Sequence, residues 1–314
     1  MGKRGQPSVL ELGELTAFLE SIKSFSADLI FAPTEDGALF HYTDLGGLIG
    51  IVANADLWLT HSRYSNDDQE LTHGRDVAKS VIGEARLLVP SPGADWVDYL
   101  DLVEQFVNDA ADEAVYVCCF CKADNLLSQW RGYGANGTGV SIKFTPTGFS
   151  DVTGSDSPYG GLMRLWKVFY KLDQQRKIMN DALSFAYTHI STDPIATRAR
   201  RAADAIAFFV PTFKNEAFKD EREWRLIFTP PANCVVKPHF RSAGGMLIPY
   251  YTLRDLAPSV ASSTATAKLP INGVTVGPSV RQTLNVRSVE AILEAAGYDR
   301  VQAPVVPSQI PFRG

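Results

Sequence analysis

Two carboxylates and a guanidinium alternate along the stretch Phe218-Lys-Asp-Glu-Arg-Glu-Trp-Arg-Leu-Ile-Phe228. If this stretch is a strand, successive side chains point to opposite faces, so Glu221, Glu223 and Arg225 share one face beside an apolar core. Such a cluster is either a salt-bridged outer face or the floor of a site that handles positive charge. The elements around it must decide between these interpretations.

Other motifs whose residues could take part in chemistry are weaker signals of function. His41 stands near the end of an expected strand, where a structural hydrogen-bonding role is favoured if it is taken alone. The glycine-rich loop Gly132–Gly139 lacks the Lys-Ser/Thr of a P-loop and does not open a helix after a strand, so a flexible turn is the favoured interpretation. Three of the four cysteines fall on one expected strand at 115–121 and Cys234 stands alone, which predicts neither a disulfide nor a zinc site.

Hydrophobic periodicity predicts an α+β chain. Strands are expected at residues 38–42, 56–60, 115–121, 140–144, 162–172, 218–228, 234–236, 246–251 and 271–276, with an extended segment from residue 301. Helices are expected at residues 8–25, 45–52 (capped by Thr43 or Asp44), from about 67, 95–111, 126–131 (capped by Asp124-Asn125), 173–190, 194–218 and 286–296. We expect residues 1–37 to form a helical N-terminal extension. Residues 38–314 are expected to form a single α+β domain with a split mixed or antiparallel sheet and helical insertions at about 67–113 and 173–218.

Composition sets limits on function. The chain has 314 residues and a formal net charge of −5, which argues against a nonspecific nucleic-acid coat because phosphate neutralisation needs an excess of Lys and Arg. No run approaches the ~20 apolar residues of a membrane span, and no apolar signal core follows the first seven residues. We therefore expect a cytoplasmic protein without membrane contact.

An ordered series of motifs runs through most of the chain. It comprises Phe40-His-Tyr-Thr-x-Leu-x-x-Leu, Leu57-Trp-Leu-Thr60, Asn66-Asp67-x-x-Glu70, Cys119-Phe120, Trp130-Arg-x-Tyr133, Lys214-x-x-x-Phe218-x-x-Glu221-x-Glu223-Trp-Arg225, Val276-Gly-Pro278 and Ser308-x-Ile-Pro-Phe-Arg313. From about residue 38 to the C-terminus this series resembles the bacterial family called domain of unknown function 2971. That family name implies little about activity.

A second, looser resemblance concerns the start and the late part of the chain. A histidine on the first strand, then a capped helix and a second strand, is similar to the start of ADP-ribosyltransferase folds, including DNA-targeting toxins. Those folds place a catalytic glutamate on a late strand, often as Glu-x-Glu, and Glu221-Arg-Glu223 has that form. The resemblance implies NAD as substrate, an ADP-ribosyltransferase-like fold, and a role in a bacterial toxin or an anti-phage defence effector.

Carried over by position, the resemblance makes Glu223 the catalytic carboxylate, Glu221 a contact to substrate or acceptor, and His41 a ligand of the ribose or amide. The implied NAD contacts are His41, Tyr42, Thr43, Arg63, Asn66, Trp130, Arg131 and Tyr133, with the aromatics stacking on a planar ring and the arginines meeting the pyrophosphate. Loss of nicotinamide leaves positive charge on the sugar, and a carboxylate in a water-poor cleft stabilises it. Each residue also has a structural alternative: Trp130 as a core aromatic, Asn66 as a helix cap, and Arg225 as a neutralising partner.

Four functions stay open from the sequence. The first is ADP-ribosyl transfer to an unknown acceptor, a nucleic acid or a protein, with a partner protein or antitoxin as a possible regulator. The second is NAD hydrolysis, in which water replaces the acceptor. The third is an Mg²⁺-dependent phosphodiesterase or nuclease that uses Asp67, Glu70, Glu221 and Glu223 as oxygen ligands. If the chain uses NAD, we expect no metal. The fourth is a non-catalytic sensor that binds a nucleotide.

Overall fold

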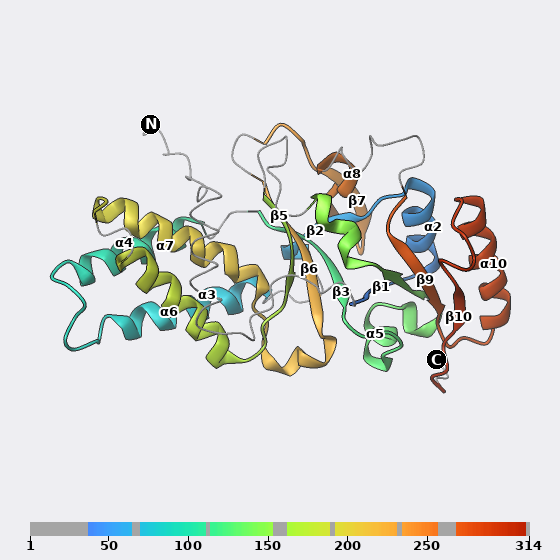
Figure 1. The fold of residues 1–314 in the computed structure, drawn as a ribbon, viewed down its shortest axis with the longest axis horizontal. Coiled ribbons are helices and arrows are strands. Elements are labelled where there is room, and N and C mark those ends of the chain that lie inside the picture. The colour runs from blue at the N-terminus through green and yellow to red at the C-terminus, as the bar shows by residue number, and fades with distance from the viewer. Residues whose placement is uncertain are drawn as a thin grey trace. The chain divides into compact units, whose positions relative to one another are not determined.

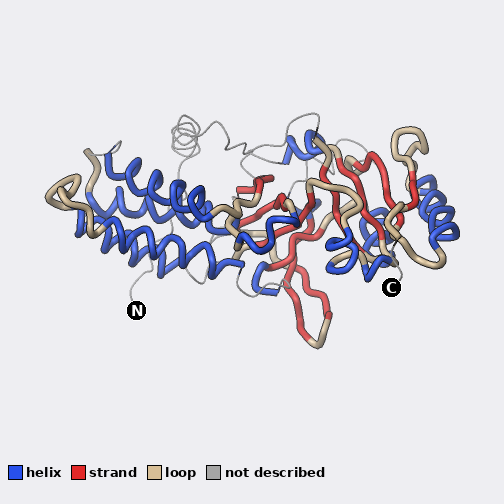
Figure 2. The backbone as a smooth tube through the Cα atoms, turned by 90° about the horizontal axis from the view of Figure 1, so that it is seen from below, coloured by secondary structure: helices blue, strands red, loops and turns tan. Residues whose placement is uncertain are grey.

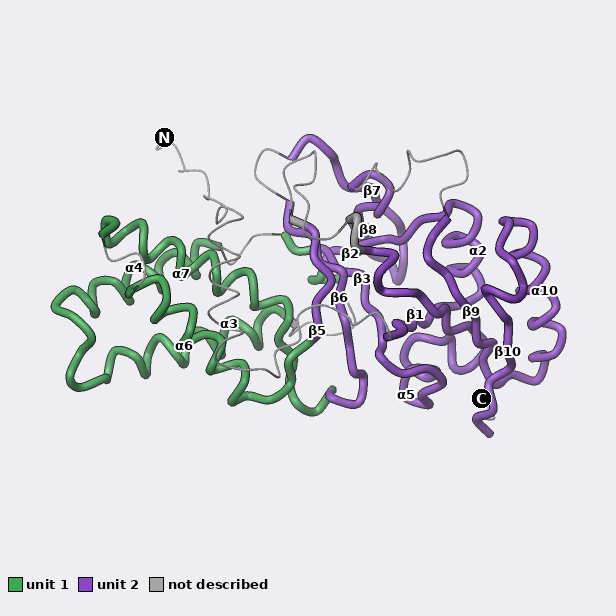
Figure 3. Tube along the Cα trace, viewed as in Figure 1, with its two compact units in different colours: residues 1–30, 62–115, 168–218 green, residues 31–61, 116–167, 219–314 purple. Residues whose placement is uncertain are grey.

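The structure is a computed structural model, and it describes residues 37–64, 70–110, 114–152, 162–188, 192–230, 234–256 and 268–311. The chain divides into two compact units (Figure 3): unit 1 holds residues 1–30, 62–115 and 168–218, and unit 2 holds residues 31–61, 116–167 and 219–314. The helix expected at 8–25 and nearly all of the expected extension 1–37 lie outside the described residues. The two segments expected as helical insertions, 67–113 and 173–218, fall wholly within unit 1.

Unit 1 is helical in its described part (Figure 1). Its helices are α3 (Glu70–Ala85), α4 (Trp96–Asp109), α6 (Leu172–Thr188) and α7 (Ile195–Phe209). Helix α4 packs against α7, α7 against α6, and α6 against α3. The apolar spacing of α4 buries Tyr99, Leu100 and Val103, and the Tyr99 hydroxyl donates to the Leu183 carbonyl at 2.9 Å. The helix predicted at 95–111 is therefore confirmed.

Unit 2 is built on a sheet (Figure 2, strands in red). The described strands are β1 (Leu39–Thr43), β2 (Trp58–His61), β3 (Tyr116–Cys121), β4 (Val140–Phe144), β5 (Leu162–Lys167), β6 (Glu223–Thr229), β7 (His239–Ala243), β8 (Met246–Thr252), β9 (Ile271–Val276) and β10 (Val305–Pro307). Their order is β10-β9-β4-β1-β3-β2-β8-β7, and β6 joins β3 to β5. The pair β9–β10 is parallel and the other pairs are antiparallel. The predicted α+β class with a mixed sheet is confirmed, and the sheet is open.

Strand β3 is the point where the sheet branches. Strand β6 pairs with β3 along its whole length, from Tyr116 to Cys121. Along the other edge of β3, β2 pairs with Tyr116 and Val117, whereas β1 pairs with Cys121. Between those two contacts, neither β1 nor β2 has a register partner on β3. The sheet is therefore split between β1 and β2.

The described helices of unit 2 are α2 (Leu45–Asn54), α5 (Leu127–Gly132), α8 (Leu253–Leu256) and α10 (Gln282–Ala295). The Asp44 carboxylate accepts from the Gly47 amide at 2.6 Å, so the predicted cap of α2 is confirmed. The cap predicted for α5 is wrong, because Leu126 occupies the N-cap position and its side chain makes no capping bond. None of the helices in the described ranges is long and apolar enough to cross a bilayer.

Three further expectations differ from the structure. The helix expected at 194–218 ends at Phe209, where Pro211 enters a 3₁₀ turn and cannot donate a helical hydrogen bond. The strand expected at 234–236 is not formed. A hairpin of β7 and β8 follows instead, and it turns at Gly244 and Gly245, both with positive φ.

Candidate functional site

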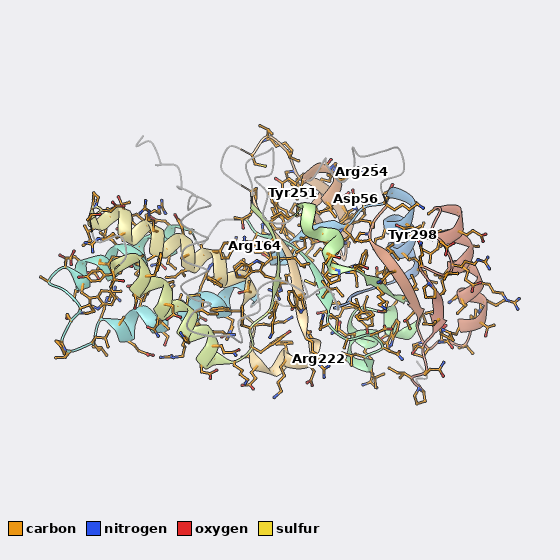
Figure 4. The ribbon with its side chains drawn as sticks, viewed as in Figure 1. Asp56, Arg164, Arg222, Tyr251, Arg254 and Tyr298 are labelled. Atoms are coloured by element: carbon orange, nitrogen blue, oxygen red, sulfur yellow. The ribbon has the colours of Figure 1, made fainter. Side chains whose placement is uncertain are left out.

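The Glu-x-Glu segment begins outside the sheet. Residues Glu216–Glu221 form a 3₁₀ helix, Arg222 follows with φ of +47°, and β6 starts at Glu223 (Figure 4 labels Arg222 at this junction). The left-handed conformation at Arg222 breaks the strand alternation. The prediction of one strand from 218 to 228 is thus wrong in its first five residues, because Glu221 belongs to the 3₁₀ helix.

Glu223 and Arg225 form a closed ion pair on β6. The Arg225 Nε donates to Glu223 Oε1 at 2.8 Å, and Nη2 donates to Oε2 at 2.9 Å. Glu223 is 6% exposed and Arg225 is 1% exposed. The two-residue spacing places both side chains on one face of the strand, as predicted. A bidentate pair of this kind fixes both groups, and it offsets the charge of the carboxylate with that of the guanidinium.

Glu221 is the more accessible carboxylate of the two. It is partly exposed, and the Tyr133 hydroxyl donates to its Oε1 at 3.5 Å, the long limit of a hydrogen bond. Tyr133 directly follows α5 and is 41% exposed. Arg131, in the last turn of α5, is also exposed. A carboxylate and an aromatic ring therefore meet at the surface where β6 begins, and Arg131 is exposed two residues before that ring.

His41 lies in the split of the sheet. Its Nδ1 and the Cys119 carbonyl oxygen are 2.8 Å apart, so the ring spans the gap where β1 leaves β3. Its ring also meets Phe120 edge to face, with centroids 5.9 Å apart. Burial lowers the pKa of the His41 imidazole, against a smaller opposing effect of the carbonyl bond. The neutral ring, with Nδ1–H donating to the carbonyl, fits these contacts.

Strand register places His41 and Glu223 on opposite faces. Phe40 pairs with Cys121, and Cys121 pairs with Glu223, so these three side chains share a face. His41 follows Phe40 and therefore points to the other face, together with Phe120. The expectation that His41 and Glu223 converge on one ligand is not met. Their individual roles stay predictions.

Two aromatics predicted to stack on NAD lie in the core. Trp130 is 0% exposed and Tyr42 is 7% exposed, and their rings meet edge to face at 5.0 Å. The Tyr42 hydroxyl donates to the Ala123 carbonyl and accepts from the Leu126 amide, and burial raises its pKa. Neither ring has a free face for a ligand in this structure. The structural alternative for Trp130 is the one that the geometry supports.

Three predicted NAD contacts remain, Thr43, Arg63 and Asn66. Thr43 is partly buried, and its hydroxyl packs against the position where a Cβ of Gly47 would stand. Arg63 is exposed in a short 3₁₀ helix of unit 1. Asn66 lies outside the described residues, as does Asp67 of the metal hypothesis. The part of the chain that the structure describes contains no group of three or more His, Cys, Asp or Glu that could hold a metal.

The glycine-rich loop is packed backbone to backbone. The Gly277 amide donates to the Gly139 carbonyl at 2.9 Å, and a Cβ at Gly139 would collide with the Thr43 carbonyl. Glycine is needed there for close approach of main chains, with no ligand required. The structure therefore agrees with the turn interpretation of this loop.

A polar cluster that sequence reasoning did not assign positions α5 and hence Tyr133. The Asn125 Oδ1 accepts from Trp130 Nε1 at 3.0 Å and from Ser308 Oγ at 2.5 Å. Asp124 Oδ2 accepts from Thr275 Oγ1 at 2.8 Å. The sequence signal was the Ser308-x-Ile-Pro motif, whose serine joins the C-terminal segment to the start of α5.

The fold and site define an α+β protein with a split mixed sheet and a partly exposed carboxylate next to a buried ion pair. A family model described as "Protein of unknown function (DUF2971)" matches residues 129–226, a stretch that includes Tyr133, Glu221, Glu223 and Arg225. The resemblance to that family is confirmed over these residues. No curated protein and no solved structure matches the chain.

Proposed function

We propose that the chain is an NAD-consuming enzyme of the ADP-ribosyltransferase type, a bacterial toxin or anti-phage defence effector that acts on a nucleic acid or protein. The observation that carries the proposal is the partly exposed Glu221, in contact with the Tyr133 hydroxyl and two residues before the buried Glu223–Arg225 pair. Departure of nicotinamide develops positive charge on the ribose. An accessible carboxylate beside an aromatic ring suits that charge and a planar leaving group.

In this proposal Glu221 and Glu223 have different roles. Glu221 touches the ribose, since Glu223 is buried and both of its oxygens are engaged by Arg225. Glu223 is then a positioning residue that fixes the start of β6 and so the place of Glu221. Tyr133 stacks on the nicotinamide, and Arg131 meets the pyrophosphate. Nicotinamide leaves as a neutral molecule, so no strong general acid is needed.

The test is nicotinamide release from NAD by the purified full chain, with DNA, RNA and protein acceptors offered in turn. We expect Glu221→Gln to lower the rate about 100-fold or more, the usual effect of removing one group that stabilises developing charge. Asp220→Asn is the matched control, because Asp220 is an exposed acid one residue away in the same 3₁₀ helix, and it should keep the rate. Absence of release with every acceptor, and equal NAD affinity in Glu221→Gln and wild type, would refute the proposal.

Two alternatives use the same assay. NAD hydrolysis is indicated if nicotinamide appears at one rate with and without acceptors. Activity lost on adding a chelator indicates the Mg²⁺-dependent reaction instead.

If Glu221 does not act in place of Glu223, the Glu223–Arg225 pair favours a non-catalytic nucleotide sensor, because both oxygens of Glu223 are engaged. Titration calorimetry that finds NAD binding without turnover would select the sensor.

A further inference from the structure

Three aromatic rings form a stacked column across β2, β8 and β7. The Trp58 and Tyr250 rings have centroids 4.4 Å apart and planes at 30°, and the His239 and Tyr250 rings have centroids 5.5 Å apart and planes at 29°. Strand pairing builds the column: Tyr250 pairs with Thr60 on one side and with His239 on the other. Trp58 is two residues from Thr60 and therefore shares its face.

This column is at the surface. Trp58 is 45% exposed, and the His239 side chain is 50% exposed. The opposite face of the same strands serves the core, where Leu59 and Tyr251 are buried (Figure 4 labels Tyr251). A half-exposed tryptophan stacked on the end of such a column is unusual on a surface that only meets water, since large aromatics are normally well buried. The column therefore suggests a ligand that stacks.

A positive charge lies on the same face as the column. Arg241 is two residues after His239 on the same face, and its buried Nε has no hydrogen-bond partner within the described ranges. Residues 234–256 contain Lys237, Arg241, Arg254 and Asp255, and Asp56, two residues before Trp58, interacts electrostatically with Arg254, so these residues carry a net charge of +1 in a chain of net −5. Both acids are already engaged, since Asp255 Oδ2 lies 2.7 Å from His239 Nε2 and Asp56 accepts from the Leu57 and Arg254 amides.

We propose that this face binds the unpaired nucleotides of a single-stranded nucleic acid. Every base has a π-face, so the outer face of Trp58 extends the column by one base without selecting its identity. Arg241 and Arg254 then meet the flanking phosphates. A duplex keeps its bases stacked inside and offers phosphates alone to this surface, so single strands are preferred. The net negative charge of the chain confines binding to this face.

The binding is independent of NAD chemistry, and its failure leaves the proposed nicotinamide release untouched. It is measured by fluorescence anisotropy of a 5′-labelled 12-nucleotide oligothymidylate and its oligouridylate counterpart, without NAD, against wild type and variants. We expect Trp58→Ala to weaken binding about tenfold or more, while Trp58→Phe keeps most of it because a ring remains. Arg241→Gln should lower the slope of log affinity against log salt by about one.

Matched controls keep the result unambiguous. Leu284→Ala removes an apolar side chain of α10 that is more exposed than Trp58, and it should leave binding unchanged. Circular dichroism checks that each variant is folded. Equal affinity of Trp58→Ala and wild type overturns the proposal, as does a duplex of the same length that binds as tightly as the single strand. Self-association that Trp58→Ala abolishes, without oligonucleotide binding, overturns it in favour of a second copy of the chain at this face.

Discussion

The buried Glu223–Arg225 pair makes a strong prediction about stability. Replacing Arg225 with Met removes the guanidinium and leaves the Glu223 carboxylate buried at 6% exposure without its bidentate partner. Charges about 4 Å apart in a protein interior interact by ~4 kcal/mol at an effective dielectric constant of about 20. Breaking a buried pair by removing one partner typically costs ~3–5 kcal/mol. Both routes predict a loss of about 4 kcal/mol in the free energy of unfolding.

A double replacement distinguishes the cost of one unpaired buried charge from the cost of altered packing. Glu223→Gln together with Arg225→Met removes both charges and keeps similar volumes, so it should recover most of the stability lost in Arg225→Met alone. Urea unfolding followed by circular dichroism measures all variants. The matched control is Arg300→Gln, which breaks a solvent-exposed pair with Glu294 in the same unit and should change stability little.

The refuting result is specific. If Arg225→Met shifts the urea midpoint no more than Arg300→Gln does, the pair is not a buried, coupled unit. A double variant as unstable as Arg225→Met would also contradict the reasoning, because the cost would then come from packing and not from an unpaired charge.

Four other groups give predictions that follow from burial. Asp56 accepts from the Leu57 and Arg254 amides, and burial raises the pKa of its carboxyl group above 3.8. The charged carboxylate therefore costs stability at pH 7, and Asp56→Asn should raise the melting temperature there. This gain should vanish below about pH 3.8, where the carboxyl group is protonated in the folded and the unfolded chain. Burial lowers the pKa of His41 below 6.5, so the unfolded chain binds a proton first as pH falls; the melting temperature should drop from pH 7 to pH 5.5, and less so in His41→Gln. Burial raises the pKa of Cys118 to about 12 and that of Cys121 to about 11, so mass spectrometry after iodoacetamide treatment at pH 8 should find both unmodified until the chain is unfolded.

Local patterns predicted the elements that depend on neighbours in the sequence. The i, i+4 apolar spacing of α4 and the Asp44 cap of α2 are set within one or two turns of helix, and both were predicted correctly. The hairpin of β7 and β8 was only half predicted. Its turn signal, Gly244-Gly245, was in the sequence, but β7 contains His, Arg and Ser and lacks the alternation of a half-buried strand.

The site depended on information that no local window contains. The charged run Lys219 to Arg222 reads equally well as a strand end or a 3₁₀ turn, and the positive φ of Arg222 decides for the turn. Trp130 lies in the core because it contacts Tyr42 of β1 and Asn125 just before α5. Opposite faces for His41 and Glu223 follow from a register that joins β1, β3 and β6.

The pairing of Glu223 with Arg225 bears on which of the two carboxylates a ligand can contact first. For Glu223 to contact a ligand, it must leave two hydrogen bonds to Arg225 and expose a buried guanidinium, which costs about as much as the loss predicted for Arg225→Met. Glu221 is partly exposed, and the Tyr133 hydroxyl approaches its Oε1 at the long distance of 3.5 Å, so a ligand can reach this carboxylate from solvent. A ligand at this face therefore meets Glu221 before Glu223. We expect Glu221→Gln to lower the rate of nicotinamide release without a loss of stability, and Glu223→Gln to lower the rate only in proportion to the folded protein that it loses. The reverse pattern would assign the catalytic role to Glu223.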